Sequence, residues 1–228
     1  MLKVDHFLLA ARNMFDCTER LREQTGLDSY DGGWFPREGL AQKLVPLGND
    51  QYIEIEGVVD LDVLEDPDGP LEAGRWVVDA VAEGDALAGW WVLTDDLDGV
   101  CERLGIEVFT VSKTLADGQV RSGQGAPPSL DALSQGLPMF WTVNDMEAHA
   151  GRVTVDHRDE PQGIAWMEVG GDEQVMRDWL GPEADQLPLR YVGGSPGLKA
   201  VALNLESAGE IVLRPSGRQL VEEPATLG

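Results

Sequence analysis

An arrangement of strand, polar break and helix occurs twice in this chain, and it constrains the fold more than any other feature. Residues 5–21 can be laid on residues 88–104 with all three elements in phase. Glu19-Arg20-Leu21 then falls on Glu102-Arg103-Leu104, and His6 falls on Gly89. The agreement of element order with sequence identity indicates an internal repeat of about 80 residues, and therefore two similar structural units.

The elements around this repeat follow from periodicity and turn residues. In the first unit we expect a strand over 3–11, a helix capped by Asn13, a loop over 29–39, and strands over 41–47 and 51–58. In the second we expect a strand over 88–94, a helix ending at Leu104, a strand over 107–111, a loop over 123–128 and a strand over 139–143. A third, more compact series follows, with a strand over 164–169, a helix over 172–180 and strands near 188–193, 198–204 and 209–213.

The expected fold class is therefore α+β, with repeated βαβββ units forming curved mixed sheets around a cavity. We assign residues 1–145 to one domain of two units, at about 1–60 and 87–145, and residues 160–215 to a shorter third unit packed on it. Residues 216–228 are expected to form a polar tail. Since the architecture is built from pairs, the third unit either completes the fold against another element or pairs across a homodimer.

The charge balance excludes several classes of partner. The chain carries 41 acidic and 17 basic residues, a net charge of -24, and such a surface repels nucleic acid and anionic lipid. No apolar run approaches the roughly 18 residues of a membrane span, and the initial FLLAA is too short for a signal peptide. We expect a cytoplasmic protein. An acidic surface poor in lysine also suits high salt, where screening removes self-repulsion.

Two strands carry the candidate functional residues. His6 opens the apolar run of the first strand, and Glu54 and Glu56 alternate along the strand over 51–58. Period-two alternation places both carboxylates on one face, where a buried acid must be paired or protonated. Adjacent Trp90 and Trp91 must point to opposite faces of their strand, so that one faces the enclosed space. His149 and His157 lie in a polar loop and are expected to be solvated or structural.

Several segments together resemble the vicinal oxygen chelate superfamily, and within it glyoxalase-like proteins related to glyoxalase, bleomycin-resistance proteins and extradiol dioxygenases. The resemblance covers most of residues 1–170. In the first part of the chain it rests on four segments, which are Asp5-His6, residues 39–48, Tyr52-Ile53-Glu54-Ile55 and Gly74-Arg75-Trp76. Asp95-Asp96-Leu97 and Asp117-Gly118 fit the second unit.

This resemblance implies a metal site. His6 and Glu54 match positions that ligate one divalent ion (Fe, Mn, Ni or Zn) in that superfamily, and Glu54 is also the candidate catalytic base. The second unit departs from the pattern, because it has Gly89 opposite His6 and no ligating side chain in Met139-Phe140-Trp141-Thr142-Val143. A third ligand would come from His157, Glu168 or Glu206, and spacing does not select among them.

Two functions follow as alternatives. One is a divalent-metal-dependent lyase, isomerase or dioxygenase-like enzyme acting on a small molecule. The other is a metal-free protein that binds or sequesters a small aromatic or hydrophobic ligand, as bleomycin-resistance-type proteins do. In both, the candidate ligand-contacting residues are Trp34, Gln42, Arg75, Trp91 and Trp141.

Overall fold

A computed structural model describes residues 1–66 and 72–222 of the protein. The first unit consists of β1 (Leu2–Ala10), α1 (Met14–Thr25), β2 (Tyr30–Phe35), β3 (Leu40–Gly48) and β4 (Gln51–Val58). Asn13 caps α1 as expected, because its side chain accepts hydrogen bonds from the backbone N–H groups of Phe15 and Asp16. Gly26, in the left-handed conformation with φ of 82°, ends the helix.

Strand β2 corrects one expectation, since residues 29–39 were expected to be a loop. It pairs with β3 along its length and, at Trp34, with β6 (Phe109–Thr114), and its register with β3 shifts between Asp31 and Gly33. A Cβ atom on Gly32 would lie 2.6 Å from Cγ of Leu44. The glycines that suggested a turn therefore allow a bulge and a close approach of neighbouring side chains inside a strand.

The second unit repeats the order of the first. Between the units lie two short helices, α2 (Leu61–Glu65) and α3 (Glu72–Ala80). The unit itself consists of β5 (Ala86–Thr94), α4 (Leu97–Leu104), β6 (Phe109–Thr114), β7 (Val120–Ala126), α5 (Asp131–Ser134) and β8 (Met139–Thr142). Part of the loop expected over 123–128 is therefore strand. Its glycines again explain the error, because Gly123 and Gly125 make room for the ring of Trp141.

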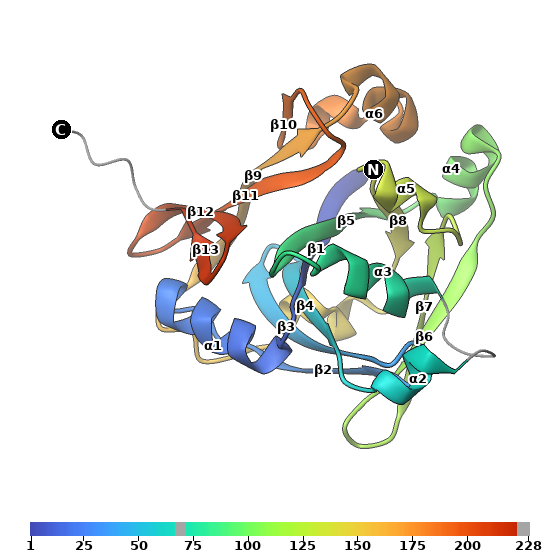
Figure 1. Cartoon of the computed structure of the whole chain (residues 1–228). Coiled ribbons are helices and arrows are strands. Elements are labelled where there is room, and N and C mark those ends of the chain that lie inside the picture. Colours follow the sequence, from blue (N-terminus) through green and yellow to red (C-terminus); the bar gives the residue numbers. More distant parts are fainter. Residues whose placement is uncertain (67–71, 223–228) are drawn as a thin grey trace.

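Eight strands close into a barrel in the order β1-β4-β3-β2-β6-β7-β8-β5, with β5 returning to β1 (Figure 1). The half from the first unit, β1-β4-β3-β2, has the same order as the half from the second, β5-β8-β7-β6. The halves meet where β1 pairs with β5 and β2 pairs with β6. The α+β fold with curved sheets around a cavity is thus confirmed.

The rest of the chain forms a second sheet beside the barrel. After two 3-10 turns, η1 (Met146–Ala148) and η2 (Ala150–Arg152), come β9 (Pro161–Gly170), α6 (Glu173–Leu180), η3 (Ala184–Gln186), β10 (Leu189–Val192), β11 (Gly197–Leu205), β12 (Gly209–Ser216) and β13 (Gln219–Val221). The strand order is β10-β9-β11-β12-β13. Strand β13 lies within the stretch expected to be a polar tail, and residues 223–228 of that tail lie outside the described residues.

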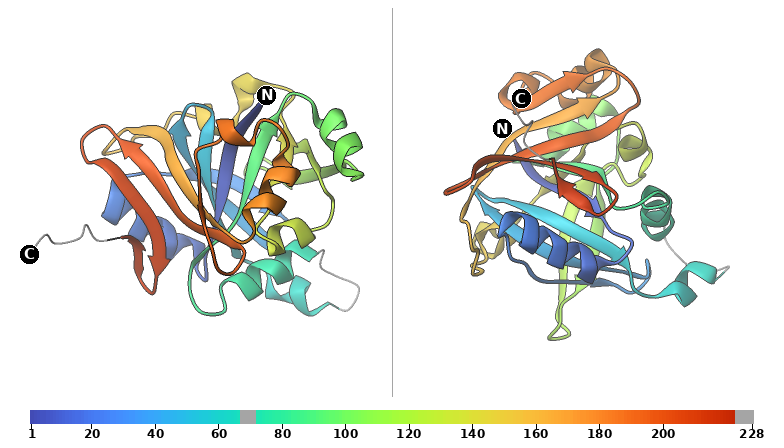
Figure 2. Two further views of the ribbon diagram at one scale, coloured as in Figure 1. Left: turned by 90° about the horizontal axis from the view of Figure 1, so that it is seen from above. Right: turned by 60° about the vertical axis from the view of Figure 1, so that its left-hand side comes forward.

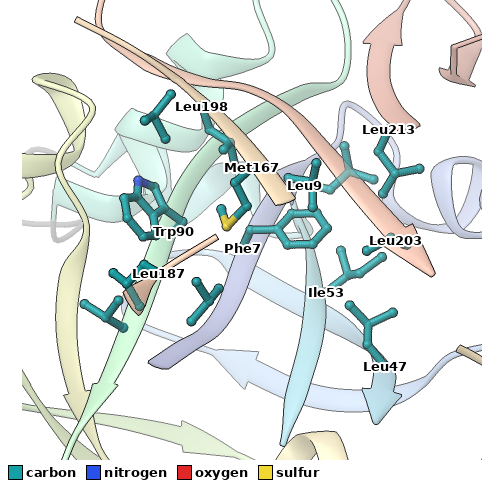
Figure 3. Close-up of a cluster of buried hydrophobic side chains, with 14 of the residues drawn as sticks. Phe7, Leu9, Leu47, Ile53, Trp90, Met167, Leu187, Leu198, Leu203 and Leu213 are labelled. Atoms are coloured by element: carbon teal, nitrogen blue, oxygen red, sulfur yellow. The ribbon is translucent and has the colours of Figure 1, made fainter. Parts of the chain in front are cut away.

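The second sheet packs on the outer wall of the barrel (Figure 2). Phe7 and Trp90 of the barrel share one hydrophobic core with Met167 and Leu203 of the sheet (Figure 3). Burial on both faces explains why β1 reads as an almost continuous apolar run. The packing of the second sheet also indicates the direction of the His6 side chain. Phe7 packs outward against that sheet, so its neighbour His6 must point into the barrel. No helix in the described part of the chain has the length and hydrophobicity needed to cross a membrane.

Candidate functional site

The barrel encloses a cavity of about 710 Å³, the usual size for a small-molecule site. Its lining comes from the inner faces of both halves, from α3, and from the segment around η1 and η2. Most of the lining is apolar, with a large aromatic share: Tyr30, Phe35, Tyr52, Trp76, Trp91, Phe109 and Trp141. Polar side chains on β1, β3, β4 and β6 face the same space, among them His6, Gln42, Glu54, Glu56 and Lys113.

The imidazole of His6 is held between two aromatic rings. Its centroid lies 4.4 Å from that of Tyr52 and 4.5 Å from that of Trp91, with interplanar angles of 17° and 13°. This stacking, with only 4% of the residue exposed, fixes the plane of the imidazole. Within that plane Nε2 faces Oε2 of Glu54 at 3.3 Å. The two residues that the sequence singled out are therefore direct neighbours.

Asp5 lies behind His6 and joins two histidines from distant parts of the chain. Its Oδ2 lies 2.6 Å from Nδ1 of His6, and its Oδ1 lies 2.8 Å from Nε2 of His149. The backbone N–H of Gly151 donates to Nδ1 of His149, so the other nitrogen of that ring carries the hydrogen and donates to Asp5. His149 is 3% exposed, so of the two alternatives expected for it, solvated or structural, the structural one holds.

On the other side of Glu54, the hydrogen bonds continue to the second half of the barrel. The Gln42 amide nitrogen donates to Oε1 of Glu54, and Nζ of Lys113 donates to the Gln42 amide oxygen at 2.6 Å. Since an ammonium group only donates, Lys113 fixes which end of the amide faces Glu54. We name this series the polar chain; its members in order are Lys113, Gln42, Glu54, His6, Asp5 and His149.

The polar chain changes the ionisation of its members. Burial would lower the pKa of His6, but hydrogen bonds to Asp5 and Glu54 raise it. Burial would raise the pKa of Asp5, but hydrogen bonds from His149 and His6 lower it. The raised pKa of His6 favours its protonated form beside the carboxyl groups of Asp5 and Glu54. Close by, burial and the Glu54 carboxylate raise the pKa of Glu56 well above its usual value and favour a neutral carboxyl group.

The residues present do not fit the divalent ion that the resemblance implies. Nε2 of His6 faces Oε2 of Glu54 at 3.3 Å, and a proton held between them would have to leave before His6 could ligate a metal. A Cβ atom on Gly89, at the matching position of the second unit, would lie 3.0 Å from Leu133 and 3.2 Å from Trp76, so apolar side chains fill that space. Within residues 1–66 and 72–222, no three His, Cys, Asp or Glu side chains are grouped to hold a metal.

The three residues suggested as a third ligand lie away from the cavity lining. Nδ1 of His157 accepts a hydrogen bond from the backbone of Asp28, and Glu168 pairs with Arg214 at 2.7 Å. The backbone N–H of Glu206 bonds the carbonyl of Glu160 where β11 ends. None of the three therefore completes a site with His6 and Glu54.

Five of the residues singled out in the sequence line one cavity: His6, Gln42, Glu54, Trp91 and Trp141. Trp34 does not, because it is 45% exposed and lines a separate small pocket of about 40 Å³, while its neighbour Phe35 points into the barrel. Arg75 is exposed on α3, and the adjacent Trp76 lines the cavity instead. In both cases the residue beside the candidate faces the cavity.

Four further residues belong to the site and were not predicted from the sequence: Asp5, Tyr52, Lys113 and His149. Two of them have a signal in the sequence. Asp5 is a carboxylate inside a buried strand and needs partners, and Tyr52 alternates with Glu54 on β4. Lys113 and His149 have no such signal, because their positions depend on barrel closure and on the path of an irregular segment.

Comparison with known proteins agrees with this architecture. A family model described as Glyoxalase-like domain matches residues 4–183. A hypothetical protein from Staphylococcus aureus has a similar structure, with a TM-score of 0.66 and 15% identity over 91% of this chain and 92% of that one. Methylmalonyl-CoA epimerase from Mycobacterium tuberculosis aligns with a TM-score of 0.43 and 14% identity, over 64% of this chain and 90% of that one.

The structural likeness to the staphylococcal protein, at this low identity, shows the fold alone. No curated protein matches the sequence. The family model covers most of the chain, including both halves of the barrel and the first strand and helix of the second sheet. This chain belongs to the family of proteins with a glyoxalase-like domain.

Proposed function

We propose that this protein binds a small molecule with an aromatic or apolar body inside the barrel and that it does so without a resident metal ion. The observation that carries the proposal is the cavity of about 710 Å³, in which aromatic rings and a few convergent polar groups face one space. This combination is typical of small-molecule sites. The rings supply apolar contact area, and the polar groups orient the ligand.

The polar chain gives the bound molecule a defined electrostatic environment. Tyr52 and Trp91 hold the His6 imidazole, and Gln42 holds the Glu54 carboxylate from the opposite side. Glu56 is only 8% exposed and lines the cavity, and its carboxyl group makes no hydrogen bond to the described part of the protein. A ligand oxygen or nitrogen that bonds Glu56 would satisfy a group that is otherwise costly to bury.

The alternative, a metal-dependent lyase, isomerase or dioxygenase-like enzyme with Glu54 as base, stays a prediction from the family resemblance. It needs a ligand set beyond His6 and Glu54, and catalytic zinc sites commonly have three protein ligands. The described residues provide two candidate ligands at the expected position, His6 and Glu54. The geometry therefore supports metal-free binding better.

The test measures tryptophan fluorescence and thermal melting of the intact protein against a library of small aromatic compounds, with a chelator present. We expect at least one compound to quench fluorescence and raise the melting temperature. Trp141→Phe should weaken this response, and the control Trp34→Phe should not, because Trp34 lies outside the cavity. No response in the chelated protein would oppose the proposal. A melting shift with added Zn, Mn, Ni or Fe, abolished by His6→Ala and Glu54→Gln, would support the metal-dependent alternative.

A further inference from the structure

Lys113 differs from the other lysines of this chain. The sequence contains four, Lys3, Lys43, Lys113 and Lys199, and in the described part of the structure Lys113 is the one that lines the cavity. Lys3 pairs with Asp50 at 3.4 Å, and Lys43 pairs with Asp31 at 2.5 Å. Lys199 bonds the hydroxyl of Ser195 and the carbonyl of Pro196.

Lys113 has no carboxylate within ion-pair distance among residues 1–66 and 72–222, although acidic residues outnumber basic ones by 41 to 17. Its recorded hydrogen-bond partner is the neutral oxygen of Gln42. Burial, partly offset by the Glu54 carboxylate, lowers the pKa of Lys113. A buried amine that lines the cavity beside Phe109 and Val111 and has no ion-pair partner among the described residues has the properties of a nucleophilic lysine.

The surroundings of Lys113 would also position an electrophile. Phe109 and Val111, on the same face of β6, line the cavity together with Trp141. The hydrogen bond to Gln42 orients the amine and leaves its lone pair, when neutral, free for attack. A planar ligand resting on these apolar side chains would present a polar carbon to Nζ.

We infer that Lys113 forms an imine with an aldehyde or ketone group of the ligand. Nζ attacks the carbonyl carbon, a C–N bond forms, and a proton moves from nitrogen to oxygen to give a carbinolamine. The C–O bond then breaks, and the hydroxyl group leaves as water with the remaining proton of the nitrogen. Carbonyl compound and amine become imine and water, and no oxidant, reductant or metal takes part. This inference rests on the proposed function, because it requires the cavity to admit the ligand.

The test treats the intact protein with benzaldehyde and sodium cyanoborohydride, which converts an imine into a stable benzylamine. Peptide mapping then locates the benzyl group among four lysines and the N-terminus. At limiting benzaldehyde we expect roughly tenfold more label on Lys113 than on Lys43. Lys113→Arg keeps a cation beside Gln42 and should abolish the dominant label, and the control Lys43→Arg should leave it unchanged. The mapping on the unaltered protein decides the question even if Lys113→Arg fails to fold.

Binding of benzyl alcohol, which cannot form an imine, separates the two proposals. If benzyl alcohol quenches tryptophan fluorescence and the benzyl label spreads over Lys3, Lys43 and Lys199, the cavity binds ligands and the imine inference is wrong. If benzyl alcohol does not bind and Lys113 is not labelled, both are wrong for this ligand size. Dominant labelling of Lys113 supports the inference.

Discussion

His149 donates a hydrogen bond to Asp5 over 2.8 Å, although the two residues lie 144 positions apart in the chain. The bond ties the segment of η1 and η2 to the first strand. It also leaves the second oxygen of Asp5 to hold His6. The orientation of the imidazole therefore depends on a residue beyond the last strand of the barrel.

Replacing Asp5 by Asn should destabilise the fold and disorder the site. The oxygen of the Asn amide can accept a hydrogen bond from one imidazole, but its NH₂ group would face the N–H of the other imidazole. The buried carboxylate that pairs with His6 would also be lost. We expect a loss on the order of 3 kcal/mol in the free energy of unfolding, measured by chemical denaturation. Asp95→Asn, at an exposed aspartate, is the control and should change stability little. Equal effects of the two changes would contradict the role of Asp5.

The raised pKa of His6 predicts a pH-dependent stability. Since the folded state holds the proton more tightly than the unfolded state, the contribution of His6 is complete below its ordinary pKa of 6.5 and is lost as pH rises through the folded value. The difference in unfolding free energy between the natural protein and His6→Gln should therefore shrink from about pH 5 to about pH 9.

His157 provides a control of opposite sign for that experiment. Burial lowers its pKa, so the folded state disfavours its proton. Stability relative to His157→Gln should rise with pH until the ordinary value of 6.5 is passed. A pH-independent difference for His6→Gln would show that the imidazolium does not contribute to stability.

The contact between barrel and second sheet predicts a large effect at Phe7. Its ring is fully buried against Met167 and its neighbours, so Phe7→Ala should cost about 3 to 5 kcal/mol in unfolding free energy. Phe15, 64% exposed on α1, is the matched control, and Phe15→Ala should change stability by less than about 0.5 kcal/mol. Similar losses at the two positions would show that the second sheet does not stabilise the barrel.

A methyl group on β7 should disturb the cavity through Trp141. The Cβ atom of Gly123→Ala would lie 2.2 Å from the indole ring, which must therefore move. We expect an altered near-ultraviolet circular dichroism signal and about tenfold weaker binding of any cavity ligand, equal to about 1.4 kcal/mol. Gly193→Ala meets nothing within 4 Å and is the control. Unchanged ligand affinity in Gly123→Ala would exclude Trp141 from the binding site.

Salt should stabilise the protein. The net charge is -24, so the excess negative charges repel one another in the compact folded state. Screening at high ionic strength weakens this repulsion. The melting temperature should therefore rise between about 0.1 M and about 2 M potassium chloride. A constant or falling melting temperature would exclude adaptation of this surface to high salt.

Periodicity and turn residues predicted much of the architecture. They failed where tertiary contacts determine the conformation of a segment. Alternation predicted opposite faces for Trp90 and Trp91, and the structure has one in the core and the other in the cavity. The helix cap at Asn13 follows from its hydrogen-bonding side chain. Strand β2 was missed because glycine signals a turn locally, whereas here Gly32 accommodates a neighbouring strand's Leu44.

The candidate site could be predicted in part for the same reason. His6 and Glu54 stand out because strands with regular alternation carry them. Lys113 joins them through Gln42 only when the two halves meet, and His149 joins them through an irregular segment whose path no periodicity encodes. The repeat in the sequence lays Gly89 on His6. That apolar side chains fill the space beside it follows only from the folded structure.

Gly89 has a consequence for how a molecule would lie inside the barrel. A barrel with two equivalent halves would present the same groups to both ends of a bound molecule, which could then bind in either of two orientations. Here the half of the first unit presents His6 and Glu54, and the matching position of the second presents Leu133 and Trp76. We therefore expect a molecule with one polar end and one apolar end to bind in one preferred orientation.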